Sequence, residues 1–361
     1  MCFVASFLTQ KYKPKVVASW GALLAVLGWL GASNAPNLTL MMMIICQSFV
    51  VGSGFGCMYV AGVVVVGNSF SKSMSRALGL VTCGSALGQI VVNVVAGLLL
   101  DSGWTWRNIF FYKMMGCLVC FFFYIFLIPN NTSSSARVAP TNPEANEANN
   151  ATISPEEATT SAGESREPFL LEHPNLGVFF LYMFADFLAV ASMPYASLPE
   201  VTPNLAKYLI ATIGGGSLLG RFASGEICNL QWVKMLYKLM LTSLAIVFAA
   251  AIPAIYAKWF DFDNRINFVL CFLFGLFTGC WISATSPIMV NLLGSSNLGT
   301  AFGTLTLVRG AATYLSGIIV AQAEEIGGKA TPLYISSGLF SVAAVFFTLA
   351  ALKIGRRRAG V

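Results

Sequence analysis

The stretch that decides the fold class is residues 214–225, which read GGGSLLGRFASG. It lies in the middle of an apolar segment long enough to span a bilayer, yet it contains Arg221 among five glycines. A guanidinium keeps its charge in proteins, and placing it at the centre of a membrane helix costs roughly 2.5 to 3.5 kcal/mol on insertion scales. The sequence therefore predicts a membrane-embedded charge that needs compensation, and an anionic substrate could provide it.

The composition of the whole chain is that of a polytopic membrane protein. Of its 361 residues, 57% are hydrophobic and 10% are charged, against about 25% charged residues in soluble domains. The apolar segment 1–9 is too short to span and is predicted to be the end of a helix. Ten further segments are long enough to cross a hydrocarbon core of about 30 Å: 16–33, 38–66, 77–100, 108–128, 175–198, 205–228, 234–256, 266–293, 298–322 and 332–354. We expect an all-α membrane fold of ten full spans plus this stub.

Residues 129–174 divide the predicted spans into two groups. This segment is rich in Asn, Thr, Ser, Pro and Glu and has almost no large apolar side chains before Phe169, a composition typical of disorder. Three units are therefore predicted: a transmembrane bundle over 1–128, a disordered linker over 129–174 and a six-helix transmembrane bundle over 175–361.

The distribution of Lys and Arg predicts the orientation of the chain. Eleven Lys and Arg residues are predicted to lie on the same side of the membrane as the linker and the C-terminus, and six are predicted to lie on the opposite side. The positive-inside bias then places the linker and the C-terminus in the cytoplasm. We expect a multi-pass integral membrane protein, with the plasma membrane as its location.

Three ionisable residues lie deep in predicted spans of the second half. At about 1.5 Å per helical residue, Asp186 and Arg309 lie roughly 17 Å from the nearer membrane edge and Arg221 roughly 12 Å. Arg221 can bind a substrate carboxylate through its planar fork, pair with Asp186, or extend toward the membrane edge. Asp186 can be a permanent counter-ion or a proton carrier. Arg309 can contact substrate or hold helices together.

The sequence offers no pattern typical of an enzyme. We find no phosphate-binding glycine loop, no metal-ligand cluster and no nucleophile with a neighbouring base. The single histidine, His173, adjoins Pro174 at the end of the linker. We therefore predict no catalytic residue, no metal and no cofactor, and a basic stripe that would indicate a nucleic-acid partner is absent.

Four motifs, in their order and spacing, resemble the monocarboxylate transporter family of the major facilitator superfamily. Residues 76–88, RALGLVTCGSALG, are similar to that family's fifth-helix signature, and residues 103–110, GWTWRNIF, to the turn that follows it. Residues 194–200, PYASLPE, resemble the end of helix seven, and residues 291–303, NLLGSSNLGTAFG, the loop into helix eleven. The resemblance implies twelve helices in two six-helix halves, alternating access, and proton-linked movement of small carboxylates such as lactate or pyruvate.

The resemblance also implies roles for individual residues. Arg221 falls on the family's eighth-helix arginine, which is proposed to bind the substrate carboxylate. Ser217 stands where characterised members have a proton-linked Asp on the same helix face, so we count it among the substrate-binding residues and nominate Asp186 for proton coupling. Arg309 stands where the family usually has Gln, and we name it as a further candidate substrate-binding residue.

Other functions remain open at the level of the sequence. The family's first helix and most of its second are not found, so we expect an N-terminally truncated member. One alternative is a carrier of another organic anion or of a neutral solute. Another is a truncated, non-transporting membrane scaffold or decoy that acts through its linker. An accessory membrane subunit is also an open question.

Overall fold

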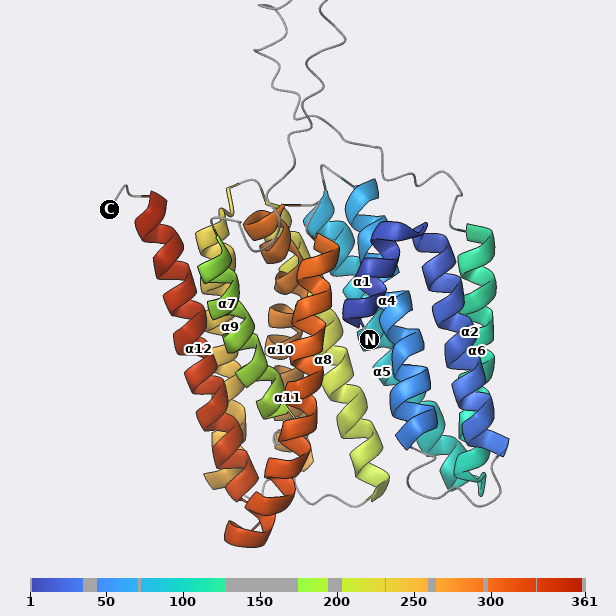
Figure 1. The fold of residues 1–361 in the computed structure, drawn as a ribbon. Helices are drawn as coiled ribbons and strands as arrows, with labels where there is room; N and C mark the ends of the chain where they lie inside the picture. The colour runs from blue at the N-terminus through green and yellow to red at the C-terminus, as the bar shows by residue number, and fades with distance from the viewer. Residues whose placement is uncertain are drawn as a thin grey trace, which may run out of the picture.

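The computed structural model describes residues 2–34, 44–70, 73–127, 175–193, 203–230, 232–258, 264–294, 298–328 and 330–358. Within these ranges the chain is helical and contains no strand. The helices lie side by side along one common direction (Figure 1). This architecture confirms the predicted all-α fold class.

The first group of helices comes from the N-terminal part of the chain. Its α1 is the expected short stub. The predicted span 38–66 appears as a π-helix, η1, that continues directly into α4, with residues 35–43 outside the described ranges. The members of this group are α1 (Cys2–Lys11), α2 (Pro14–Asn34), η1 (Ile44–Val51), α4 (Gly52–Ser69), α5 (Met74–Asp101) and α6 (Trp106–Leu127).

The second group is formed by the C-terminal part of the chain. It consists of α7 (Leu176–Ser192), α8 (Pro203–Asn229), α9 (Met235–Lys258), α10 (Asn264–Leu293), α11 (Leu298–Gly327) and α12 (Thr331–Arg358). Each of the ten predicted spans thus overlaps described helix, while residues 38–43 and 194–198 of two spans lie outside the described ranges. The last two helices extend to residues 327 and 358, a few residues beyond their predicted ends.

Eight of the described helical segments are long and apolar enough to cross a membrane. Two predicted spans are not among them. The α7 helix is apolar but only 17 residues long where the structure describes it. The α8 helix has 27 residues, but its glycines, serines and Arg221 leave no stretch of it as apolar as a candidate span requires.

The two groups meet along α5 and α8, which lie between the remaining helices in Figure 1. These two helices run antiparallel, because Arg76 near the start of α5 pairs with Glu226 near the end of α8 at 2.6 Å. At the other end, Lys207 of α8 pairs with Asp101 of α5. A second contact between the groups joins α1 to α11.

Glycines allow α8 to pack very closely against α10. A Cβ built on Gly216 would collide with the carbonyl oxygen of Phe272, and one built on Gly275 would collide with the carbonyl oxygen of Ile213. Glycines four residues apart allow such close approach of helix backbones. The pairs 216/220 and 275/279 are therefore helix-packing glycines, whereas Gly84 and Gly88 face no described atom within 4 Å.

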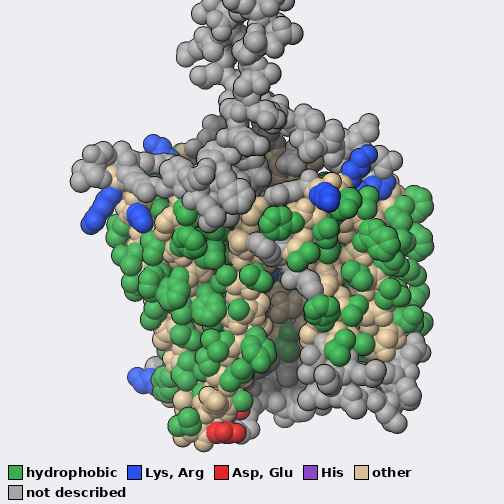
Figure 2. Space-filling model, viewed as in Figure 1, with side chains coloured by type: hydrophobic (Ala, Val, Ile, Leu, Met, Phe, Trp, Pro, Cys, Tyr) green, Lys and Arg blue, Asp and Glu red, His purple; other side chains and the backbone are tan. Residues whose placement is uncertain are grey.

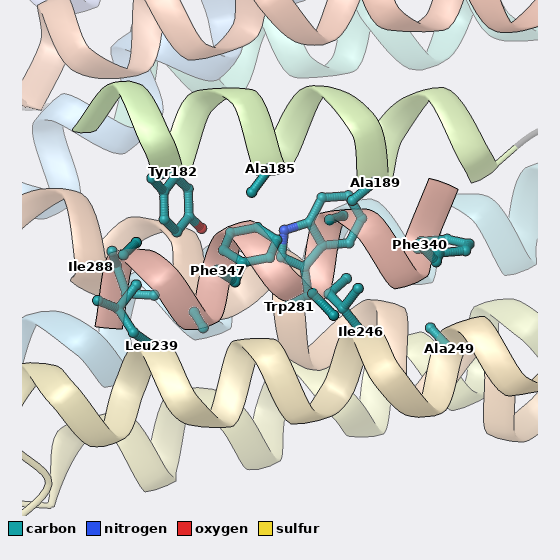
Figure 3. Packing of buried hydrophobic residues seen from close by; sticks show 14 of the residues in the cluster. Tyr182, Ala185, Ala189, Leu239, Ile246, Ala249, Trp281, Ile288, Phe340 and Phe347 are labelled. Atoms are coloured by element: carbon teal, nitrogen blue, oxygen red, sulfur yellow. The ribbon is translucent and has the colours of Figure 1, made fainter. Parts of the chain in front are cut away.

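A large apolar core holds the second group together. Figure 3 shows Tyr182 of α7, Trp281 of α10 and Phe347 of α12 converging in this core, and all three are fully buried. Many large apolar side chains instead cover the outside of the molecule (Figure 2). Tyr314 and Phe126 are examples, at 76% and 79% exposed. Such an apolar exterior is expected where lipid replaces water as the solvent.

Several sequence predictions fall outside the described residues. They concern the linker over 129–174, the motif at 194–200 and His173. The three-unit division of the chain remains a prediction.

Candidate functional site

The candidate site lies between the two groups of helices. It takes residues from α4 and α5 on one side and from α7, α8, α10 and α11 on the other. The face drawn in Figure 2 is hollowed between these two groups. Arg221, Arg309 and Asp186, which the sequence analysis placed deep in their spans, all have buried or mostly buried side chains.

Asp186 and Arg309 form a bidentate ion pair between α7 and α11. Nε of Arg309 donates to Oδ2 of Asp186 at 2.7 Å, and Nη2 donates to Oδ1, also at 2.7 Å. The side chain of Asp186 is 0% exposed and that of Arg309 is 18% exposed. The arginine therefore covers the carboxylate and presents the accessible side of the pair. Parallel hydrogen bonds of this kind are among the strongest in proteins.

Residues of α10 complete the surroundings of this pair. Thr285 Oγ1 accepts a hydrogen bond from Nη2 of Arg309 at 3.2 Å and another from the hydroxyl of Tyr182 at 2.9 Å. The guanidinium of Arg309 also lies 5.7 Å from the ring centre of Trp281, within the range of a cation–π interaction. Contacts from α7 and α10 thus fix the orientation of Arg309.

Arg221 has a different kind of environment, made of neutral acceptors. Its Nε donates to Ser217 Oγ at 3.1 Å on the preceding turn of α8. Its Nη1 donates to the backbone carbonyl oxygen of Thr82 at 2.5 Å and to the hydroxyl of Ser85, both on α5. The side chain of Arg221 therefore joins the two groups of helices.

No carboxylate of the described residues lies within ion-pair distance of Arg221. The pairing with Asp186, which the sequence left open, is not formed, because Asp186 directs both oxygens to Arg309. Extension to the membrane edge is also not observed, since Arg221 is only 7% exposed. Its charge is buried without an acidic partner in the part of the chain that the structure describes.

The local packing of α8 explains why Arg221 reaches α5. Glycines on one face of α8 press that helix against α10, and Ser283 of α10 donates a hydrogen bond to the carbonyl oxygen of Arg221 at 3.0 Å. On the side of α5, Gly225 packs against Gly79 without an intervening side chain. Both contacts hold the α8 backbone close to its neighbours, so the long Arg221 side chain can donate to α5.

The two arginines share one electrostatic environment. Arg221 and Arg309 are close enough to repel each other, and Tyr59 of α4 lies near both. Arg221 and Arg309 each contribute +1 and Asp186 contributes −1, so the three charges sum to +1. The described ion pairs Arg76–Glu226 and Lys207–Asp101 lie at helix ends and do not alter this sum.

Several polar residues of the site were not predicted from the sequence: Tyr59, Thr82, Ser85, Tyr182 and Thr285. Thr82 and Ser85 lie within the motif 76–88 that resembles the family's fifth-helix signature, but the sequence analysis gave them no role. Nothing in the sequence pattern distinguishes the other three positions. Ser85 lies 136 residues from Arg221 along the chain, so only the fold brings the two together. The described residues contain no group of three His, Cys, Asp or Glu side chains that could hold a metal ion.

The comparisons with known proteins agree with this architecture. The sequence profile of the Major Facilitator Superfamily matches residues 1–317. The solved structure of the human organic anion transporter MFSD10 (TETRAN) aligns with a TM-score of 0.69 at 11% identity, over 96% of this chain and 80% of that one. At that identity the likeness concerns the fold alone.

Two relatives illustrate the range of similar sequences. The agnestins efflux protein AgnL12 of Paecilomyces divaricatus is 24% identical over 98% of this chain and 75% of that protein. Monocarboxylate transporter 10 of Mus musculus is 24% identical over 84% of this chain. The aligned part is 58% of the mouse protein's length. The sequence similarity to monocarboxylate transporters that the motifs predicted is thus confirmed.

Proposed function

This chain belongs to the Major Facilitator Superfamily, a family of transporters rather than enzymes, and from that premise we propose that it moves a small organic anion across the membrane by alternating access. Within that class, a monocarboxylate such as lactate or pyruvate is the proposed substrate. Arg221 is proposed to bind its carboxylate, with Arg309 and Ser217 as further contacts.

The observation that carries this proposal is the unpaired charge of Arg221. The described structure surrounds this buried guanidinium with two hydroxyls and one carbonyl, and its Nη2 makes no hydrogen bond to a described residue. A carboxylate would add the missing negative charge and accept from this nitrogen. Major facilitator relatives named for monocarboxylate transport support the choice of substrate class.

Proton coupling is the second part of the proposal. Of the described carboxylates, Asp186 is the one that pairs with an arginine of the site, Arg309. Protonation of Asp186 would break this bidentate pair. Movement of one proton with one monoanion carries no net charge, so uptake would respond to a pH gradient and not to voltage. Uptake that ignores a pH gradient would remove proton coupling and leave the anion carrier intact.

A second candidate is a carrier that exports a larger organic anion. One relative that aligns over 98% of this chain is named as an efflux protein, and another that aligns over the same share is named Monocarboxylate transporter 2. The same arginines would bind the anionic group of such a substrate. Counterflow assays with preloaded vesicles separate the two candidates, because a monocarboxylate carrier exchanges labelled lactate for unlabelled lactate and an exporter of larger anions does not.

We also propose that the protein lies in the plasma membrane. In the proposed orientation, the linker and the C-terminus are on the cytoplasmic side. On the face shown in Figure 2, most Lys and Arg side chains gather at the end of the molecule where α12 ends. The positive-inside bias supports a cytoplasmic position for that end.

Uptake of labelled lactate into liposomes that contain the purified full chain tests the proposal. We expect Arg221→Ala to lower uptake at least about tenfold, which corresponds to about 1.4 kcal/mol. Arg221→Lys should also transport poorly, because an ammonium cannot reproduce the planar fork. Arg265→Ala is the matched control, since Arg265 is exposed near the start of α10. Unchanged uptake by Arg221→Ala would contradict the proposed anchor.

A further inference from the structure

The two site arginines are neutralised to different extents. Arg309 directs Nε and Nη2 to the two oxygens of Asp186, whereas Arg221 donates only to neutral groups among the described residues. The positive charge that is available to an anion is therefore close to one unit, although two guanidiniums are present.

We propose that Asp186, in its ionised form, determines the charge of the anion that binds, by neutralising Arg309 so that the site accepts monoanions and rejects dianions. This inference rests on the proposed function, since it concerns the same site. It adds a specificity-determining residue, which acts on the substrate through Arg309 and does not touch it.

The burial of the pair supports this role. Asp186 is 0% exposed, and the 18% exposed Arg309 lies on its accessible side. An entering anion would therefore meet the guanidinium, while the carboxylate behind it cancels that charge. Arg221 lies within electrostatic range of Arg309, so an anion near Arg221 is also within the field of the Asp186–Arg309 pair.

Electrostatics in a buried site makes one unit of charge decisive. Charges interact more strongly in a protein interior than in water, because the effective dielectric constant is lower. A monoanion brings the three charges of this site from +1 to zero. A dianion brings them to −1, and an excess charge at membrane depth is costly. Removal of the Asp186 charge would raise the empty site to +2, which a dianion neutralises.

The test compares the binding of two probes, propionate as the monoanion and succinate as the dianion. Isothermal titration of the purified full chain in nanodiscs, at one pH and one ionic strength, gives the ratio of their dissociation constants. We expect the wild-type chain to favour propionate. In Asp186→Asn the ratio should shift toward succinate by at least about tenfold, equivalent to about 1.4 kcal/mol.

A double variant tests whether the effect comes from charge balance. Asp186→Asn combined with Arg309→Gln removes both charges of the pair and returns the site to +1, so the preference for propionate should return. Asp101→Asn is the matched control, because it removes an aspartate that pairs with Lys207 at the ends of α5 and α8. Its ratio should equal that of the wild-type chain.

Each outcome separates this inference from the proposed function. An unchanged ratio in a monodisperse Asp186→Asn variant overturns the inference, even where the wild-type chain binds propionate. A shift that persists in the double variant also overturns it, because charge balance then does not explain the effect. Binding of succinate by Asp186→Asn, with no anion bound by the wild-type chain, supports the inference and contradicts the proposed monocarboxylate function.

Two remaining outcomes are also decisive. Absence of binding by every variant contradicts both proposals. Where Asp186→Asn alone does not fold, the double variant is compared with the wild-type chain. Equal preference for propionate supports the inference, and a preference for succinate in the double variant overturns it.

Discussion

Gly79 of α5 and Gly225 of α8 pack backbone against backbone where the two groups of helices meet. A Cβ built on Gly79 would lie 2.8 Å from the Cα of Gly225, a distance that real side chains do not tolerate. Thr82 lies one turn after Gly79, and Arg221 lies one turn before Gly225. The close approach of these glycines therefore sets the distance over which Arg221 donates to α5.

The first prediction follows from this contact. Gly79→Ala should push α5 and α8 apart, and overpacking of this kind costs about 1–3 kcal/mol. The hydrogen bonds from Arg221 to Thr82 and Ser85 should weaken, so we expect both a lower Tm and slower lactate uptake. Measurements of Tm in detergent and of uptake in liposomes, at matched protein amounts, test both effects.

A second glycine of the same helix provides the control. Gly84 also lies on α5, but a Cβ there would meet no described atom within 4 Å. Gly84→Ala should therefore keep the Tm and the uptake of the wild-type chain. Equal behaviour of the two variants would show that the α5–α8 contact does not depend on the absence of a side chain at Gly79.

The second prediction concerns two adjacent glycines of α8. A Cβ on Gly216 would collide with the backbone of α10 at Phe272, whereas one on Gly215 would meet no described atom within 4 Å. Gly216→Ala should lower stability by about 1–3 kcal/mol. Gly215→Ala should be neutral or should stabilise the helix by up to about 1 kcal/mol. Thermal unfolding of both variants checks this, and a Gly216→Ala variant as stable as Gly215→Ala would contradict the packing argument.

The number and order of the helices could be predicted because each span is a local hydropathy pattern. The buried positions of Arg221, Asp186 and Arg309 could be predicted for the same reason. Their partners could not, because the rotation of each helix about its axis decides which side chains meet. Arg309 therefore forms the pair that was considered for Arg221, and the acceptors Thr82 and Ser85 on α5 were missed.

The glycines illustrate the same limit. The sequence contains five pairs of glycines four residues apart, at 52/56, 84/88, 216/220, 275/279 and 299/303, and it does not show which of them lie at helix contacts. In the structure, Gly216 and Gly275 lie at backbone contacts between α8 and α10, while Gly84 and Gly88 of α5 meet no described neighbour. The spacing of four permits close packing of helix backbones, but such packing occurs only where another helix lies against the glycines.

The third prediction tests the hydroxyl that links Tyr182 to Arg309. Thr285→Val keeps the shape of the side chain but leaves the fully buried Tyr182 hydroxyl without its acceptor. An unsatisfied buried polar group costs about 1–3 kcal/mol, so the Tm should fall. Thr285→Ser keeps the hydroxyl and should retain most of the stability.

A double variant checks the cause of that loss. Tyr182→Phe combined with Thr285→Val removes both partners of the hydrogen bond, and such a removal is close to neutral. The double variant should therefore be more stable than Thr285→Val alone. A double variant that is less stable than both single variants would mean that the loss comes from packing in the core shown in Figure 3.

The fourth prediction places a carboxyl beside Arg221. Ser217 Oγ accepts from Nε of Arg221 at 3.1 Å, so the carboxylate of a Ser217→Asp variant would pair with the guanidinium and compete with a substrate anion. Protonation of that carboxyl at low pH would end the competition. We therefore expect lactate uptake by this variant to be weak at high pH and to recover as the pH falls.

Ser217→Asn is the control for this prediction. Its side chain is nearly identical in shape to that of Asp and cannot titrate, so the difference between the two uptake profiles isolates the added charge. Parallel profiles would mean that Arg221 is not the group that binds the anion.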